Sequence, residues 1–168
     1  MIGRRAVIAG LFASPLLGGC GFQPLYAERD GAPGVETILR GIDVVPLTTR
    51  TGQLVRNALL EGIAPADAGG GRYRLEMDVK EKEQAAILSA RDESTQNRLV
   101  IDVTYRLVDA ATGKVVHEGR TFAEGTYTHT RLPVANIQAR ESAREALARV
   151  LATDIRTRLA AWLVSRQA

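Results

Sequence analysis

The sequence predicts an α+β fold in which two helices pack on one face of a mainly antiparallel four-stranded sheet. Apolar residues alternate with charged ones in the middle of the chain, which is typical of strands with one buried and one solvated face. The chain has no glycine or proline after Pro133, and its apolar residues there recur at helical spacing. The predicted order of elements is β-α-β-β-β-α, which gives a two-layer sandwich.

The first strand and the first helix are predicted before residue 64. A short apolar run at Ile42–Leu47 indicates a strand, and the sequence leaves open whether this strand pairs in parallel. Helical spacing of the next apolar residues predicts an amphipathic helix over Thr51–Gly62, with N-cap candidates in Thr48–Thr51. The glycine run at 69–71 makes the connection to the next element.

Three longer strands are expected to form a meander. Arg72–Val79 alternates strictly, and the segment continues with charged residues to Leu88. Leu99–Leu107 alternates in the same way, and Val115–Thr126 completes the meander. The apolar phase of this last strand is ambiguous, and Gly119 is a candidate position for a bulge.

A long helix is predicted over Val134–Ser165. A helix of about 30 residues is about 45 Å long, so it would cross the whole sheet. Its predicted apolar stripe comprises Ala143, Leu147, Val150, Leu151, Ile155, Leu159, Trp162 and Leu163.

Residues 1–19 have the organisation of a secretory signal peptide. Two arginines precede the apolar run Ala6–Leu17, which is too short to span a bilayer because spanning needs about 20 apolar residues. Small residues follow, and Leu17 stands three positions before Cys20, a spacing typical of a bacterial lipobox. The alternative is a chance cysteine behind an ordinary signal peptide.

Cys20 is the predicted site of lipidation. Its thiol would carry a diacylglycerol, and cleavage before it would free an amine for an N-acyl chain; two or three chains anchor a protein durably. No other cofactor is expected, and a single cysteine excludes disulfides within the chain. Residues 20–41 then form a lipidated tether, and residues 42–165 form a single domain.

Composition and motifs argue against nucleic acid and against catalysis. Removal of residues 1–19 leaves 22 − 2 = 20 basic against 19 acidic residues, a net charge of +1, which gives no reason to expect a nucleic-acid partner. The two histidines, His117 and His129, have no metal-ligand spacing, and no serine lies in a G-x-S-x-G motif. Neither a metal site nor an enzyme such as a periplasmic hydrolase is therefore expected.

The start of the mature chain resembles that of the LptE family of lipopolysaccharide-assembly lipoproteins. The resemblance rests on the residues Cys20-Gly21-Phe22-Gln23-Pro24-Leu25-Tyr26 directly after the lipobox, and on an element order that agrees with that family. It implies a plug within the β-barrel protein LptD that helps the barrel to assemble and takes part in lipopolysaccharide transport. Gly21, where an aspartate would commonly retain a lipoprotein at the inner membrane, implies the outer membrane, with the domain facing the periplasm or the barrel lumen. The alternative is a lipid-anchored periplasmic adaptor of another envelope complex.

Four basic residues near one end of the predicted sheet are candidates for binding lipopolysaccharide. Cations on the outward side of neighbouring strands can gather within reach of one phosphate group. LptE proteins contact the glycolipid through basic residues around the sheet tip, although without a strict motif. The alternative is a solvated face of mixed charge, and Glu81 and Glu83 are expected to be solvated at the same strand end. The candidates are Lys80, Lys82, Arg91 and Arg98.

Overall fold

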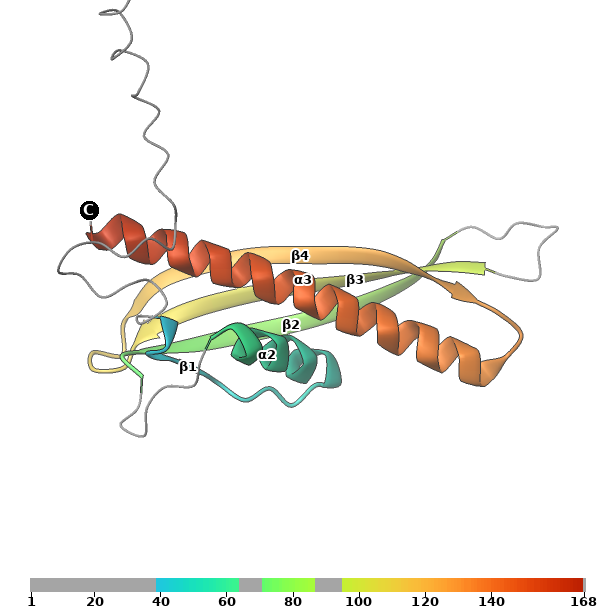
Figure 1. Cartoon of the computed structure of the whole chain (residues 1–168), viewed down its shortest axis with the longest axis horizontal. Coiled ribbons are helices and arrows are strands. Elements are labelled where there is room, and N and C mark those ends of the chain that lie inside the picture. The colour runs from blue at the N-terminus through green and yellow to red at the C-terminus, as the bar shows by residue number, and fades with distance from the viewer. Residues whose placement is uncertain (1–38, 64–70, 87–94, 168) are drawn as a thin grey trace, which may run out of the picture.

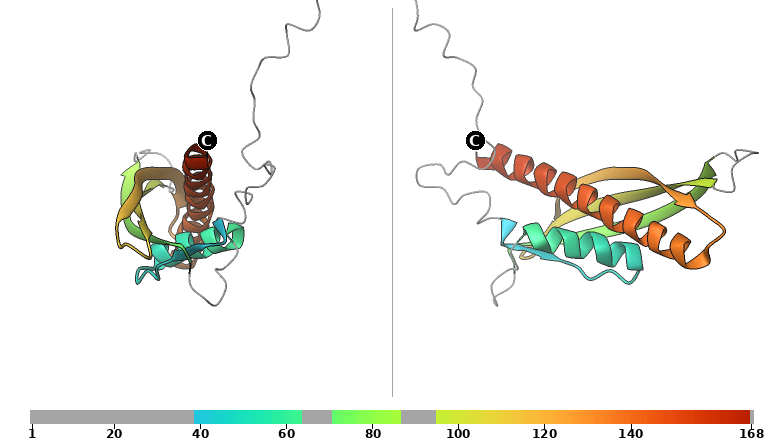
Figure 2. Two further views of the ribbon diagram at one scale, coloured as in Figure 1. Left: turned by 90° about the vertical axis from the view of Figure 1, so that its left-hand side faces the viewer. Right: turned by 45° about the vertical axis from the view of Figure 1, so that its right-hand side comes forward.

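The fold is a four-stranded sheet with two helices on one face, which confirms the predicted α+β class (Figure 1). The computed structural model describes residues 39–63, 71–86 and 95–167. Figure 2 shows the sheet curling around the long helix, so that its concave inner face meets the helices and its convex outer face stays open. The elements in chain order are β1 (Ile42–Val44), α2 (Arg50–Gly62), β2 (Tyr73–Ala86), β3 (Thr95–Asp109), β4 (Val115–His129) and α3 (Pro133–Gln167).

The strands lie in the order β1-β2-β3-β4, and β1 pairs in parallel with β2. This settles the direction that the sequence left open, and α2 provides the crossover that a parallel pair requires. The strand is shorter than predicted. Val45 still donates a backbone hydrogen bond of 3.0 Å to Leu75, but Pro46 has no N–H with which to continue the ladder.

Helix α2 begins where the capping residues predicted it. The Thr49 side chain accepts a hydrogen bond of 3.1 Å from the backbone N–H of Gly52, which satisfies one of the unpaired N–H groups of the first turn. Val55 and Leu59 point into the core between the sheet and α3.

The inner face of the meander supplies most of the strand side of the core. In β3 the predicted alternation is confirmed, since its inward residues Leu99–Leu107 are at most 1% exposed. In β4 the inward positions include Thr121 and Ala123, whereas Phe122 is 63% exposed on the outer face. The register shift lies opposite Val115, between Leu107 and Val108, so the expected bulge at Gly119 is wrong.

Helix α3 joins the core only through its C-terminal part. Its buried residues run from Leu147 to Leu163, and none of the residues 133–146 is buried. The predicted stripe is correct except at Val150, which is 58% exposed. In Figure 1 the N-terminal part of α3 diverges from the sheet. We call this end of the molecule the distal end, and the opposite end, with β1 and the last turn of α3, the proximal end.

The folded domain also includes a residue that the sequence assigned to the tether. Leu39 is 3% exposed and packs in the core with Ile42. The remainder of the tether up to residue 38 and the signal segment lie outside the described residues, as does Cys20.

Candidate functional site

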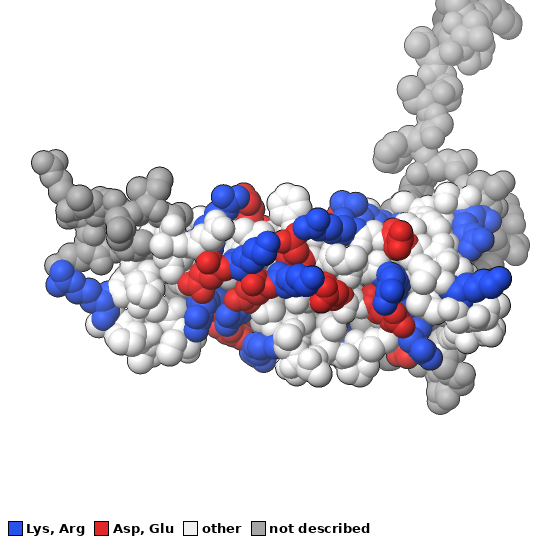
Figure 3. Space-filling model, turned by 180° about the vertical axis from the view of Figure 1, so that it is seen from behind, with Lys and Arg blue, Asp and Glu red and all other residues white. Residues whose placement is uncertain are grey.

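The outer face of the sheet carries a lattice of opposite charges. Arg106 of β3 pairs with Glu76 of β2 at 3.1 Å, and Arg120 of β4 pairs with Asp102 of β3 at 2.9 Å. Figure 3 shows acidic and basic side chains interleaved across the middle of this face. Exposed pairs of this kind contribute at most about 1 kcal/mol each, so the lattice matters more as a hydrated surface than as a source of stability.

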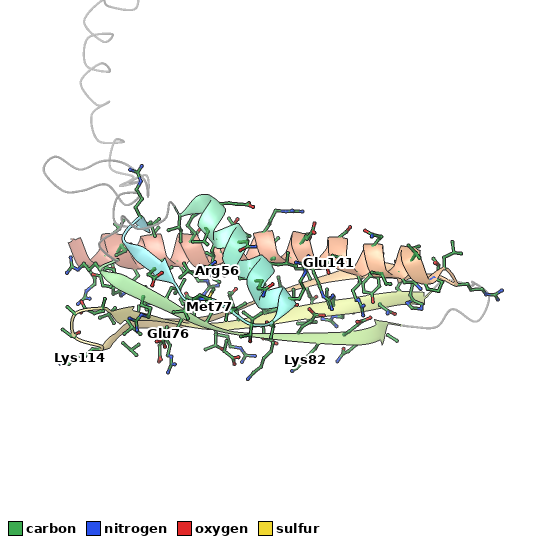
Figure 4. The ribbon with its side chains drawn as sticks, turned by 90° about the horizontal axis from the view of Figure 1, so that it is seen from below. Arg56, Glu76, Met77, Lys82, Lys114 and Glu141 are labelled. Carbon is green, nitrogen blue, oxygen red and sulfur yellow. The ribbon has the colours of Figure 1, made fainter. Side chains whose placement is uncertain are left out.

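The structure brings three of the four candidate cations together on this outer face, toward the distal end. Lys80 and Lys82 are outward residues of β2, and Arg98 is an outward residue of β3, opposite Gln84. Arg98 is thus a diagonal neighbour of Lys82, at a typical separation of about 7–8 Å. Figure 4 shows Lys82 pointing away from the helices. Arg91 lies outside the described residues.

Two of these three cations already have acidic partners. Lys80 pairs with Asp78 at 3.1 Å, and Arg98 donates a hydrogen bond to Glu124 of β4. Within the described ranges, Lys82 forms no ion pair. The sheet end therefore combines one unpaired cation with two that are partly neutralised, and a phosphate would compete with the carboxylates for the latter.

A polar network closes the distal end of the core on the inner side of the sheet. Arg144 of α3 binds both carboxylate oxygens of Glu81 through Nε, at 3.0 and 2.9 Å, and through Nη2 at 2.5 Å to Oε1. Thr51 of α2 donates a hydrogen bond to the same carboxylate, and Glu141 of α3 pairs with Arg50 of α2 at 2.5 Å. Glu81 is therefore a structural anchor between three elements, and the expectation that it is solvated is wrong.

Glu83, two residues further along β2, also faces the helix. Tyr127 and Asn97 donate hydrogen bonds to its carboxylate, the latter at 3.0 Å, and Arg140 of α3 lies 3.7 Å away. The hydrogen bond from Tyr127 is the main reason why the pKa of Glu83 is held below its usual value. Burial raises the pKa of Tyr127, and its hydrogen bond to Glu83 adds to the rise.

A cavity of about 510 Å³ lies beside this network, between the end of β4 and the start of α3. Arg140 and His129 bring polar groups to its wall, and Ile137 brings apolar surface. Asn136 holds the preceding loop in place, since it accepts a 2.7 Å hydrogen bond from the backbone N–H of Thr130. The cavity thus offers polar and apolar groups side by side, as the binding of an amphiphile requires.

The lining of this cavity was not predicted from the sequence. A signal is present, however: Ile137 stands 18 residues, or five helical turns, before the buried Ile155, so it continues the apolar stripe of α3 beyond the core. Ile137 is 57% exposed and lines the cavity, and Leu132 and Val134 are exposed apolar residues near it in the sequence.

The described residues show no arrangement typical of a metal centre. Within residues 39–63, 71–86 and 95–167, no group of three or more His, Cys, Asp or Glu side chains is placed to hold a metal ion. His117 and His129 lie near opposite ends of β4. No helix in this part of the chain has the length and apolar character needed to cross a membrane.

Comparison with known proteins identifies a matching family model for the sequence and solved structures with the same fold. The family model described as LptE, lipopolysaccharide-assembly, matches residues 39–159. The crystal structure of a protein from Caulobacter crescentus CB15, described as a lipoprotein, is 30% identical and has a TM-score of 0.65. The match covers 79% of this chain and 96% of that chain. No curated protein matches the sequence.

Two more distant structures share the fold. Rare lipoprotein B from Shewanella oneidensis is 14% identical with a TM-score of 0.54, over 76% of this chain and 97% of that chain. A minor lipoprotein from Acinetobacter baumannii is 16% identical with a TM-score of 0.52, over 71% of this chain and 88% of that chain. The two-layer architecture is thus common to proteins whose sequences have diverged widely.

Proposed function

The chain belongs to the LptE family of lipopolysaccharide-assembly proteins, and from that premise we propose that it plugs the β-barrel protein LptD and helps to deliver lipopolysaccharide to the cell surface. The observation that carries this proposal is the charge lattice of the outer face. The lumen of a large outer-membrane barrel is polar, so a plug needs a hydrated surface of mixed charge. The task requires binding and positioning, and no catalytic step.

The proposed attachment to the outer membrane depends on Cys20. Acyl chains on this residue would hold the protein at the membrane, with the domain facing the periplasm or the barrel lumen. Buried acyl methylenes contribute about 0.8 kcal/mol each, so two or three chains suffice. Under this proposal residues 1–19 are removed and the chain from residue 20 connects the anchor to the domain.

Lipopolysaccharide is the proposed ligand of the distal end. Its phosphates are suited to Lys82, Arg91 and Arg98, because arginine binds phosphate in bidentate fashion and lysine adds a compact charge. The neighbouring cavity supports this proposal, since Arg140 and Ile137 would meet the polar and the acyl parts of one amphiphilic molecule.

The experiment that tests the partner is a pull-down from detergent-solubilised outer membranes with a tag after Ala168. We expect a large β-barrel subunit to copurify in equal amount. The Cys20→Ala chain is the control, because without acylation it should leave the membrane fraction and recover less of the barrel. A clean monomer would contradict the plug assignment, and a different envelope complex would favour the adaptor alternative.

Charge reversal of two candidate cations tests the ligand. We expect the double variant Arg91→Glu and Arg98→Glu to bind lipopolysaccharide about 25-fold more weakly, since each cation near an anionic lipid contributes about 1 kcal/mol, or about fivefold. Reversal of Arg74 and Arg106, which lie on the same face toward the proximal end, is the matched control. Equilibrium binding to purified lipopolysaccharide is the measurement, with thermal unfolding as a check on folding. If both double variants bind lipopolysaccharide equally well, Arg91 and Arg98 are solvated surface charges without a specific role in binding.

A further inference from the structure

The proximal end of the molecule gathers four exposed cations from four separate segments. Arg40 precedes β1, Arg72 precedes β2, Lys114 ends the turn between β3 and β4, and Arg166 lies in the last turn of α3. Figure 4 shows Lys114 at this end, on the turn between β3 and β4. We call these four residues the proximal basic patch.

Main-chain hydrogen bonds hold the segments of this patch side by side. The carbonyl oxygen of Gly41, next to Arg40, accepts a bond of 3.2 Å from the N–H of Tyr73. The carbonyl oxygen of Arg72 accepts a bond of 3.0 Å from Ala110 in the β3–β4 turn. The patch is therefore built on the sheet itself.

Aromatic rings join α3 to the same place. Trp162 meets Tyr73 edge-on with ring centroids 6.0 Å apart, and it stacks on His117 at 5.3 Å. The guanidinium of Arg166 lies 5.1 Å above the Trp162 ring, and that of Arg72 lies 5.3 Å above the Tyr73 ring. Cation–π contacts of this kind fix the two arginines at the surface and leave their N–H groups available.

Carboxylates neutralise many of the cations on the outer face by ion pairing, but in the described part of the chain they form no such pairs with the proximal basic patch. Among the described residues, none of its four members forms an ion pair. Asp109 lies at this end, where its carboxylate accepts hydrogen bonds from Thr112 and Ala111 within its own turn; these bonds and the charge of Arg72 lower its pKa, so it offsets one charge of the patch. Asp43 is the exposed acid beside the patch on β1. The patch thus keeps a net positive charge.

We propose that the proximal basic patch binds the phosphate headgroups of anionic phospholipids in the membrane to which the protein is anchored. This inference rests on the proposed lipidation of Cys20. Arginine and lysine near an anionic surface each favour binding about fivefold, and a patch of this kind supplements acyl chains as a second attachment signal. The patch would hold the proximal end of the domain at the headgroups.

The position of the tether favours this end over the other. The chain enters the described structure at Leu39, beside the patch, and Leu39 follows Cys20 by only 19 positions. A chain of 19 steps can span at most about 65 Å, whereas the 35 residues of α3 alone are about 52 Å long. A tether that brought the distal end to the membrane would have to run almost fully extended along the domain.

The single tryptophan of the chain, Trp162, allows a direct test. The lipidated protein would be reconstituted into vesicles that contain a nitroxide on a fraction of the headgroups, either in phosphatidylcholine alone or with phosphatidylglycerol added. We expect quenching of Trp162 fluorescence to be about twofold stronger with the anionic lipid and to weaken at high salt, because surface charges are screened. Flotation of the same vesicles measures attachment separately.

Matched variants assign the effect to the patch. Arg40→Gln with Lys114→Gln removes two of the four charges and should abolish the lipid-dependent part of the quenching. The fluorescence of Trp162 itself should not change, since neither residue contacts its ring. Arg120→Gln with Arg149→Gln removes the same charge from β4 and the middle of α3 and should preserve it. Flotation without a phosphatidylglycerol effect would overturn the patch and leave the anchor intact. If the protein floats only with anionic vesicles, and Arg40→Gln with Lys114→Gln no longer floats, the result would support the patch and reject the anchor. If the protein floats with neither kind of vesicle, both proposals would be rejected.

Discussion

Replacement of Arg144 by methionine is expected to lower the free energy of unfolding by about 2–3 kcal/mol. The change removes three hydrogen bonds to Glu81 and leaves that carboxylate facing the core without its cation. Loss of one partner of a fully buried pair costs about 3–5 kcal/mol. The expected value here is lower because both side chains remain 19% exposed, which allows solvent to screen the remaining charge. Urea unfolding at neutral pH measures the difference.

The matched control is Arg158→Met, which breaks an exposed pair with Asp154 on the same helix. Exposed pairs four residues apart contribute about 0.3–0.5 kcal/mol, so a loss as large as that of Arg144→Met would contradict the structural role of the distal network.

The contribution of Arg144 to the free energy of unfolding should also depend on pH. Burial alone would raise the pKa of Glu81, but hydrogen bonds from Arg144 and Thr51 and the charges of Arg144 and Arg140 outweigh it and hold this pKa below 4.5. A lowered pKa in the folded state stabilises the protein above the unfolded pKa, and this stabilisation is lost as pH falls through the folded value. The difference between the parent chain and Arg144→Met should therefore shrink below about pH 4.5.

Replacement of Gly119 by alanine is expected to destabilise the domain by about 1–3 kcal/mol, the usual cost of overpacking. Gly119 lies opposite Tyr105 in the β3–β4 register, and the fully buried Tyr105 ring lies across it. A methyl group there would stand 2.5 Å from the Tyr105 hydroxyl oxygen and 2.6 Å from its Cζ. The ring would have to move within a packed core, which unfolding in urea would detect.

A double-mutant cycle separates this clash from a general intolerance of β4. Combined with Tyr105→Leu, Gly119→Ala should cost less than it does alone, because the shorter side chain no longer reaches the new methyl group. Gly125→Ala on the same strand is the control, since the three atoms nearest to its methyl group would all belong to the Leu147 side chain, the closest being Cδ2 at 3.3 Å. Additive effects in the cycle would contradict the proposed contact.

The elements themselves were predictable because their signals are local. Alternation in β3 and the helical spacing of Leu147, Ile155 and Leu159 each reflect burial of one face of one element. The Thr49 cap was predictable for the same reason, since its hydrogen bond joins residues only three positions apart. Gly119 was misinterpreted because a glycine in a strand indicates either a bulge or a close neighbour, and the neighbour is supplied by another strand.

The order of elements, the core face of β3 and the resemblance to the LptE family can be read from the sequence alone. Which charges meet depends on how the elements pack against one another. Glu81 and Lys82 are adjacent in a run of charged residues, yet one lies inside against Arg144 and the other outside without an ion pair among the described residues. Likewise, Arg40, Arg72, Lys114 and Arg166 are far apart in the sequence and form one patch only after folding. Local periodicity fixes the face on which a side chain lies, whereas its partner depends on strand register and helix crossing, which are set by packing across the whole domain.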